Sequence, residues 1–353
     1  MAKKVTMQQI ADYLGVSKFV VSKALSGKQG VSDVTRAKVL ETASKLGYYP
    51  SKNNENTTQT TSLSSSSSNQ GDKQVVLVLM PNIRFQTTQS SYWGKIINGI
   101  SFSLEKHRVG MVIITENNIE SLARVLNPEA IVGVISVGVV STSLLLEINR
   151  LNIPLIMVDY EEALIQCDTI FHNNFDSSWN LTNYLLGLGH NELQFVGDIK
   201  YSRSFYDRFL GFRSSLEEHD ISIPLDKRLY RIDMTAVREH FEDWVNTNVS
   251  SLPTVFVCAN DNIAQKVIAV LTKRNFQVPK DISVTGFDNQ EATYLESPTI
   301  TTVNVAKIEL GKRAVEMLFR RIAEPESSFE KVLLAGNMML RESTAMAKSK
   351  NAD

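Results

Sequence analysis

The sequence has few of the residues that mark metal binding, redox chemistry or catalysis. Only two cysteines, Cys167 and Cys258, occur among 353 residues, and without an export signal we expect reduced thiols rather than a disulfide. No cysteine and histidine grouping has the spacing of a metal site, and no glycine-rich phosphate-binding motif occurs. No serine, histidine and acid stand in a catalytic arrangement. The sequence therefore predicts no metal, no cofactor and no enzymatic activity.

Long apolar runs are also missing. No stretch approaches the ~20 consecutive apolar residues that a membrane span requires. The basic start is followed by polar residues where a signal peptide would have an apolar segment. Hydrophobic residues nevertheless make up 43% of the chain, enough for a sizeable core. We therefore expect a cytoplasmic globular protein with no membrane partner.

The net charge of −1 conceals an uneven distribution. Residues 1–50 contain eight Lys and Arg against three Asp and Glu, a charge of +5, which leaves −6 for residues 51–353. A basic N-terminal segment on an acidic body indicates a polyanionic partner for that segment alone. A solvated charged surface is the alternative interpretation of this charge pattern.

Residues 51–73 form a polar linker rich in Ser, Asn and Thr, with a single leucine. Such a composition cannot bury enough apolar surface to order itself. Three short helical patterns precede the linker, and a turn at Gly15 separates the first two. Each begins at a Ser or Thr that can cap it: Thr6, Ser17 and Ser32. The first two patterns have the form of a helix-turn-helix.

A recognition helix places its N-terminal turns in the major groove of DNA. In the second helix, Lys23 can donate to guanine, and Phe19 can contact a thymine methyl group. Other polar side chains can bind phosphates. The predicted DNA-contacting residues are Thr6, Ser17, Lys18, Phe19, Val20, Ser22, Lys23 and Lys28. A three-helix module for protein contact is the alternative.

After the linker, short apolar runs alternate with amphipathic helical patterns. The run Val75–Met80, for example, is followed by the helical pattern Trp93–Glu105. This alternation predicts parallel βαβ units. Because about 270 residues exceed one typical domain, we expect two α/β lobes. Open α/β sheets bind ligands at the carboxyl ends of their strands, so polar and aromatic residues just after the strands are candidate ligand contacts.

The N-terminal segment VTMQQIADYLGVSKFVVSKALSGKQGVSDVTRAKVLETASKLGYYP resembles the head of the lactose-repressor (LacI/GalR) family nearly position for position. The body motifs WGKIINGI, LGLGH, DRFLGF, CANDNIA, ISVTGFDN, SPTITTVNV and LRESTA extend the resemblance over almost the whole chain. The resemblance implies an all-α helix-turn-helix head and an α/β body. That body would have two Rossmann-like lobes, as in type I periplasmic sugar-binding proteins, with an effector cleft between them.

The resemblance also implies domain boundaries. The domains would be the DNA-binding head 1–50, the linker 51–73 in place of a hinge, the effector-binding and dimerisation body 74–345, and the tail 346–353. Within the body, lobe one would comprise 74–173 and 304–326, and lobe two 174–303 and 327–345.

Effector-binding roles come from the resemblance and from position after a strand. The candidates are Tyr92, Trp93, Asp159, Tyr160, Asn173, Arg208, Asn260, Asp261 and Asp288. Carboxylates and guanidinium groups pair with hydroxyls, and aromatic rings stack on the apolar faces of sugars. Two alternatives stay open: Arg208 and Asp288 as a purely structural ion pair between the lobes, and Tyr92 and Trp93 as core residues.

Two features depart from the family pattern. Thr57 stands where the hinge leucine that wedges into the minor groove is expected, and the linker is longer than usual. We therefore expect weaker operator bending and a more tolerant half-site spacing. Lys23 replaces a common arginine and lacks its bidentate fork, so discrimination of guanine should be weaker.

The resemblance thus implies a transcriptional repressor that binds pseudo-palindromic, double-stranded operator DNA under the control of a small-molecule effector, a carbohydrate by class. No leucine heptad follows the body, so a homodimer is expected rather than a tetramer. Two alternatives remain: a regulator controlled by a protein corepressor, and a soluble ligand-binding protein whose altered hinge impairs operator binding.

Overall fold

The computed structural model describes residues 7–25, 74–80, 92–115, 130–222, 227–295 and 297–348, together with Ser32, Thr35, Lys38, Val39 and Thr42. The chain divides into two compact units, Met1–Asn69 and Gln70–Asp353, called here the head and the body. Four features of the sequence analysis lie outside the described residues: the linker 51–73 with Thr57, most of the third helical pattern, Thr6 and Lys28.

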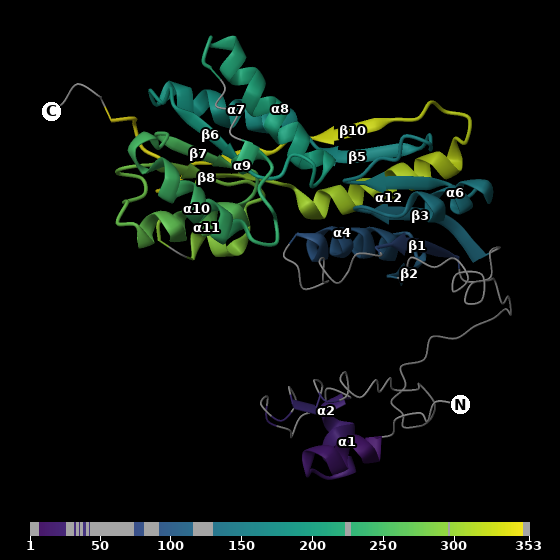
Figure 1. The fold of residues 1–353 in the computed structure, drawn as a ribbon. Helices are drawn as coiled ribbons and strands as arrows, with labels where there is room; N and C mark the ends of the chain where they lie inside the picture. Colours follow the sequence, from purple (N-terminus) through teal and green to yellow (C-terminus); the bar gives the residue numbers. More distant parts are fainter. Residues whose placement is uncertain are drawn as a thin grey trace, which may run out of the picture. The chain divides into compact units, whose positions relative to one another are not determined.

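The head contains helices α1 (Met7–Leu14) and α2 (Lys18–Leu25) (Figure 1). Gly15 between them has a φ of 64°, a conformation that favours glycine. The Ser17 hydroxyl accepts a hydrogen bond from the Val20 amide at 3.3 Å, so Ser17 caps α2 as predicted. Among the described residues of the head, Ile10, Ala11, Val21, Ala24 and Val39 form a buried hydrophobic cluster. The small Ala11 side chain lets the two helices cross closely.

Lobe one of the body is built on a six-stranded parallel sheet with the order β10-β5-β4-β3-β1-β2. Its strands are β1 (Val75–Leu79), β2 (Gly110–Ile114), β3 (Ile131–Val137), β4 (Leu155–Val158), β5 (Asp168–His172) and β10 (Lys331–Leu334). Successive residues of β1 face opposite sides of the sheet. Val76 and Val78 pack with helices α4 (Trp93–Lys106) and α12 (Lys307–Ala323). Leu77 and Leu79 pack with α6 (Thr142–Arg150), so both faces are covered.

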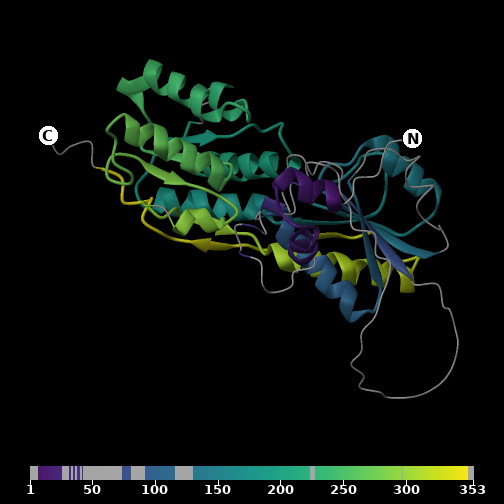
Figure 2. The same cartoon turned by 90° about the horizontal axis from the view of Figure 1, so that it is seen from below.

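Lobe two is built on a three-stranded parallel sheet with the order β6-β7-β8. Its strands are β6 (Leu193–Val196), β7 (Val255–Cys258) and β8 (Ser283–Thr285), and its helices are α7 (Asn174–Gly187), α8 (Arg203–Glu218), α9 (Lys227–Tyr230), α10 (Val237–Asn248) and α11 (Asp261–Lys273). Short 3₁₀ turns occur at η2 (Val249–Ser251) and η3 (Glu291–Tyr294). Figures 1 and 2 show the two lobes at opposite ends of the body.

Within the described part of the body, the chain passes between the lobes three times. It passes at the β5–α7 junction, at β9 (Thr302–Asn304) on the way to α12, and between β10 and β11 (Asn337–Met339). β11 pairs with β9 in an antiparallel ribbon. Both cysteines are free thiols. Among the described residues, no helix is long and apolar enough to span a bilayer.

The final segment corrects one predicted lobe boundary. Residues 327–345 are expected in lobe two, but β10 pairs with β5 and therefore extends the sheet of lobe one. Val332 and Leu334 pack against the lobe-one core, and the pairing satisfies backbone groups that the edge of β5 would otherwise leave open. The segment joins lobe two only afterwards, where the Val284 amide donates to the Ser343 carbonyl at 2.9 Å.

Helices α4 and α12 cross at two glycines. A Cβ atom at Gly99 would lie 2.1 Å from the Ile308 carbonyl oxygen, and one at Gly311 would lie 2.1 Å from the Ile96 carbonyl oxygen. Both clashes are with helix backbone, which cannot move independently of the crossing.

We expect Gly99→Ala to lower the free energy of unfolding by roughly 1–3 kcal/mol, because overpacking the crossing outweighs the better helix propensity of alanine. Gly187→Ala is the matched control, since a Cβ there meets nothing within 4 Å. Urea unfolding of the full chain measures both. Equal stabilities for the two variants would contradict the close crossing.

Candidate DNA-binding and effector sites

The exposed face of α2 contains most of the predicted DNA contacts. The Phe19 ring is 67% exposed, and the Lys23 ammonium lies 4.9 Å from its centroid. Ser17, Lys18 and Ser22 are exposed as well, whereas Val20 is half-buried. Helix α2 therefore offers an aromatic ring, two cations and two hydroxyls on a surface anchored by the buried Val21.

In the body, Arg208 is the centre of a buried polar network between the carboxyl ends of the strands. It belongs to α8 and is only 3% exposed. Its guanidinium donates to the Asn174 side-chain oxygen at 2.8 Å, to the Ala259 carbonyl at 2.7 Å and to an Asp288 carboxylate oxygen at 3.0 Å. Its Cζ lies 3.9 Å from the centroid of the Phe287 ring. A buried charge requires such compensation.

Asp288 joins this network to the lobe-one helix α12. Its backbone has a φ of 100°, and its carbonyl accepts a hydrogen bond from the Lys307 ammonium. Burial raises the pKa of Asp288 although Arg208 and Lys307 oppose the rise, and burial lowers the pKa of Lys307. A non-glycine residue held in this backbone region is typical of a functional site.

Asp159, at the end of β4, is the second acidic group of the network. The Tyr92 hydroxyl donates to one of its carboxylate oxygens at 3.2 Å, and the Ser204 hydroxyl donates to the other at 2.5 Å. Burial raises the pKa of Asp159 to about 6, and it also raises that of Tyr92. Trp93 packs edge-on against Tyr92, with ring centroids 4.9 Å apart, and against the lobe-one core.

Three of the predicted effector residues hold the surrounding backbone. Asp261 is fully buried and accepts hydrogen bonds from the Thr302 hydroxyl at 2.6 Å and the Gln290 amide at 2.8 Å. Burial, followed by the neighbouring charge of Asp288, raises the pKa of Asp261 to about 7. Asn173 and Asn260 accept amide hydrogen bonds as the N-caps of α7 and α11.

Tyr160 is not brought into the network. Its hydroxyl donates to Glu162 at 3.2 Å, and its ring packs on the α6 side of the sheet. The structure thus gathers Tyr92, Asp159, Asp261, Arg208 and Asp288 around one centre. Trp93 packs behind Tyr92, the two asparagines cap helices, and Tyr160 faces away.

Sequence reasoning missed several members of the network. Ser204 lies four residues before Arg208 in one helix, a spacing that places both on one face and could have identified it. Asn174 follows the predicted Asn173 directly. No local sequence pattern identifies Lys307 as a member of the network, because its position depends on how the chain passes from one lobe to the other.

His172, at the end of β5, is also part of these surroundings. It is buried, and one ring nitrogen lies 3.2 Å from the Ser177 hydroxyl. Burial, with smaller contributions from Arg208 and Lys307, lowers its pKa to about 3. The ring is therefore neutral at physiological pH.

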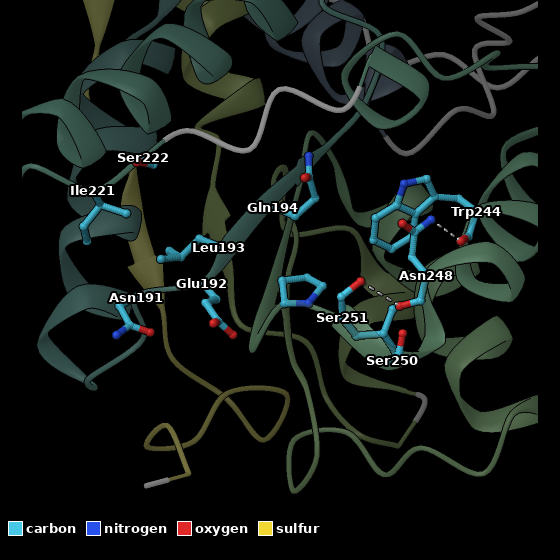
Figure 3. A pocket seen from close by; sticks show the side chains of 12 residues that line it. Asn191, Glu192, Leu193, Gln194, Ile221, Ser222, Trp244, Asn248, Ser250 and Ser251 are labelled. Carbon is cyan, nitrogen blue, oxygen red and sulfur yellow. Dashed lines mark hydrogen bonds between the residues drawn. The ribbon is translucent and has the colours of Figure 1, made fainter. Parts of the chain in front are cut away.

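A separate cavity of about 750 Å³ opens at the amino ends of β6 and β7 (Figure 3). Gln194, Trp244 and Asn248 are among its lining residues, and the Asn248 amide donates to the Trp244 carbonyl at 2.8 Å. None of the predicted effector residues lines it. The Arg208 network is a stronger candidate for the effector site than this cavity, although its side chains are closely packed. It lies at the strand ends where α/β sheets bind ligands, and it brings several charged groups together.

Two family models match the chain. Residues 6–51 match the bacterial regulatory proteins of the lacI family, and residues 182–344 match a periplasmic binding protein-like domain. The chain belongs to the LacI family. It is therefore a DNA-binding transcriptional regulator, and the predicted fold class, a helix-turn-helix head with a periplasmic-binding-protein-like body, is confirmed.

Similar proteins cover most of this LacI-family chain. The HTH-type transcriptional repressor PurR of Histophilus somni (strain 129Pt) is 25% identical over 351 residues, which cover 96% of this chain and 98% of that protein. A LacI-family regulator from Enterococcus faecium with bound ribose has a TM-score of 0.64 at 24% identity, covering 78% of this chain and all of that chain. The lac repressor dimer bound to operator and the anti-inducer ONPF has a TM-score of 0.64 at 20% identity, covering 97% of this chain and all of that chain. The two structures show a shared fold.

Asp159 predicts a pH dependence of stability. Its folded pKa of about 6 exceeds the ~3.9 of an unfolded aspartate. The folded state therefore binds more protons between these values, and the free energy of unfolding should fall as the pH rises from 4 to 6.

Asp159→Asn should flatten this part of the stability curve, measured by urea unfolding at a series of pH values. Glu162→Gln is the control, because hydrogen bonds lower the pKa of Glu162. Its removal should therefore lower stability by a constant amount above the ordinary glutamate range and change the pH dependence only below that range. An unchanged slope in Asp159→Asn would show that this carboxyl is not responsible.

Proposed function

We propose that this LacI-family regulator is a repressor that binds pseudo-palindromic operator DNA as a homodimer, and that a small carbohydrate bound between the two lobes controls its operator affinity. The observation that carries the proposal is the buried network around Arg208, where both lobes contribute side chains.

The exposed face of α2 supports the DNA-binding part of the proposal. Lys23 would donate to a guanine edge, Phe19 would contact a thymine methyl, and Val20 would lie at the margin of the groove. Thr6, Ser17, Lys18, Ser22 and Lys28 would bind phosphates, which position the helix without specifying the sequence. The Phe19–Lys23 contact, within one turn of α2, would hold the two base-reading side chains together.

The chemistry of the network supports a neutral, hydroxyl-rich effector. Arg208, Asp288, Asp159 and Tyr92 satisfy one another with hydrogen bonds that a sugar could replace with its own hydroxyls. Three carboxyl groups face two cations within this network, which disfavours a phosphorylated effector. The ribose carried by the Enterococcus faecium regulator is consistent with this class of ligand.

The remaining candidates would act through the shape of the site. Asp261, Asn173 and Asn260 would hold the backbone on which Arg208 and Asp288 depend, and Trp93 would fix the ring of Tyr92. Tyr160 would contact an effector only after a change in its own conformation, because its hydroxyl is bonded to Glu162.

The operator can be identified by selection from a randomised duplex pool at ~150 mM salt, where non-specific phosphate binding is largely suppressed. We expect Lys23→Ala to weaken binding to the selected palindrome by about 5- to 100-fold and to relax its sequence preference, because a base contact is lost. Lys273→Ala removes the same charge from the surface of lobe two, where Lys273 pairs with Glu242 at 2.6 Å, and should leave binding unchanged. Recovery of no motif would favour a ligand-binding protein without operator function.

Arg208→Lys should weaken the carbohydrate response by at least about tenfold while operator binding without effector is retained, because lysine cannot reproduce three directed hydrogen bonds. The response is measured as release from the selected operator during titration with ribose and other neutral sugars. Arg213→Lys is the control, since Arg213 lies on the same helix and pairs with the exposed Glu217. An operator complex that no sugar affects would contradict carbohydrate control and favour a protein corepressor.

A further inference from the structure

The loop that follows β4 sends alternate side chains to the two lobes. Asp159 accepts a hydrogen bond from Ser204, and Glu161 accepts one from Arg203; both partners belong to the lobe-two helix α8. Tyr160 and Glu162 instead stay within lobe one, where Glu162 accepts a hydrogen bond from the Thr142 hydroxyl at 2.6 Å. Neighbouring loop positions therefore differ in whether they contact lobe two.

Glu161 ties together elements that are distant in sequence. One of its carboxylate oxygens pairs with the Arg203 guanidinium, and the other pairs with the Lys331 ammonium on the lobe-one edge strand β10. Arg203 is held in place by Asp207, one turn further along α8, at 2.7 Å. Glu161, Arg203 and Lys331 together are called the clasp below.

The clasp lies beside the candidate effector network rather than within it. Arg203 and Ser204 are adjacent at the start of α8, and Arg208 follows one turn after Ser204 on the same rigid helix. The α8 N-terminus is itself fixed by Ser202, whose hydroxyl accepts the Phe205 amide at 3.2 Å. Loss of the contact between Arg203 and Glu161 would therefore release one of the contacts that hold the helix carrying Arg208 against lobe one.

We propose that Glu161 is a positioning residue whose clasp with Arg203 and Lys331 holds the two lobes in the orientation that brings Ser204 to Asp159. The inference rests on the proposed function in one respect: this orientation is the one in which an effector would meet both lobes. Glu161 does not contact the effector; it controls how often the two halves of the site are assembled.

The exposure of the clasp gives it a distinctive property. The Arg203 and Lys331 side chains are 43% and 44% exposed, and Glu161 is 32% exposed. Ion pairs of this kind contribute modestly and are screened by salt. Because the contact contributes only a small free energy, a ligand can still shift the equilibrium between the two orientations of the lobes. The hydrogen bonds of the buried Arg208, in contrast, should respond little to salt.

The test is hydrogen–deuterium exchange on the full chain, without effector or DNA, followed in peptides covering residues 202–210 of lobe two. Glu161→Gln should raise exchange there by about two- to fivefold, the effect expected for losing partly exposed ion pairs. Raising NaCl from 50 to 500 mM should bring the unmodified protein close to the variant and change the variant little. Glu162→Gln, which removes the same charge one residue later, should not change this region.

The double variant Glu161→Gln/Lys331→Gln, which keeps the Arg203–Asp207 pair within α8, provides a second check. It should exchange no faster than Glu161→Gln alone, because the shared contact is already lost. Equal exchange in Glu161→Gln, Glu162→Gln and the unmodified protein, or the absence of a salt effect, would overturn the clasp whether or not a sugar binds. Faster exchange in Glu161→Gln alone would support the clasp even if no sugar released the operator, so failure of the proposed function would be recognised separately.

Discussion

The body of this protein is organised around the need to compensate one buried cation. The Arg208 guanidinium is almost inaccessible to water, so every strong contact that it makes must come from protein atoms. Asn174, the Ala259 carbonyl and Asp288 supply these contacts from the start of α7, the end of β7 and the segment after β8. Because the three lie on different elements, the position of Arg208 depends on the assembly of the whole of lobe two.

The parallel sheets explain why the groups that compensate the charge of Arg208 lie at the candidate effector site. The carboxyl ends of parallel strands meet at one edge, where polar loop residues and helix N-termini collect. Asp159 reaches this region from lobe one, and Asp288 is joined by Lys307 to the first turn of α12. A charge network that crosses between lobes can respond to their relative orientation, whereas the apolar cores of the individual lobes cannot.

Much of this arrangement could be predicted from the sequence, since helix caps, alternating apolar runs and strand-terminal polar residues are local signals. Ser17, Asp288 and the βαβ pattern are examples, whereas Arg208 was indicated by the family resemblance. Tyr160 lies outside the network although nothing in the sequence distinguishes it from Asp159, and Asp159 has a positive φ of 56° at the point where the two side chains diverge. The positions of Lys307 and β10 depend on contacts between residues that are far apart in the sequence. Short-range sequence patterns carry no information about which sheet a returning strand will join.

Whether an effector binds between the lobes at the Arg208 network can be decided by a crystal structure of the protein with the sugar that releases it from its operator. We expect electron density for the sugar within hydrogen-bonding distance of Arg208 and Asp288, with the Arg208–Asp288 contact altered. Density in the cavity beside Trp244 instead, with the Arg208 network unchanged, would contradict this expectation.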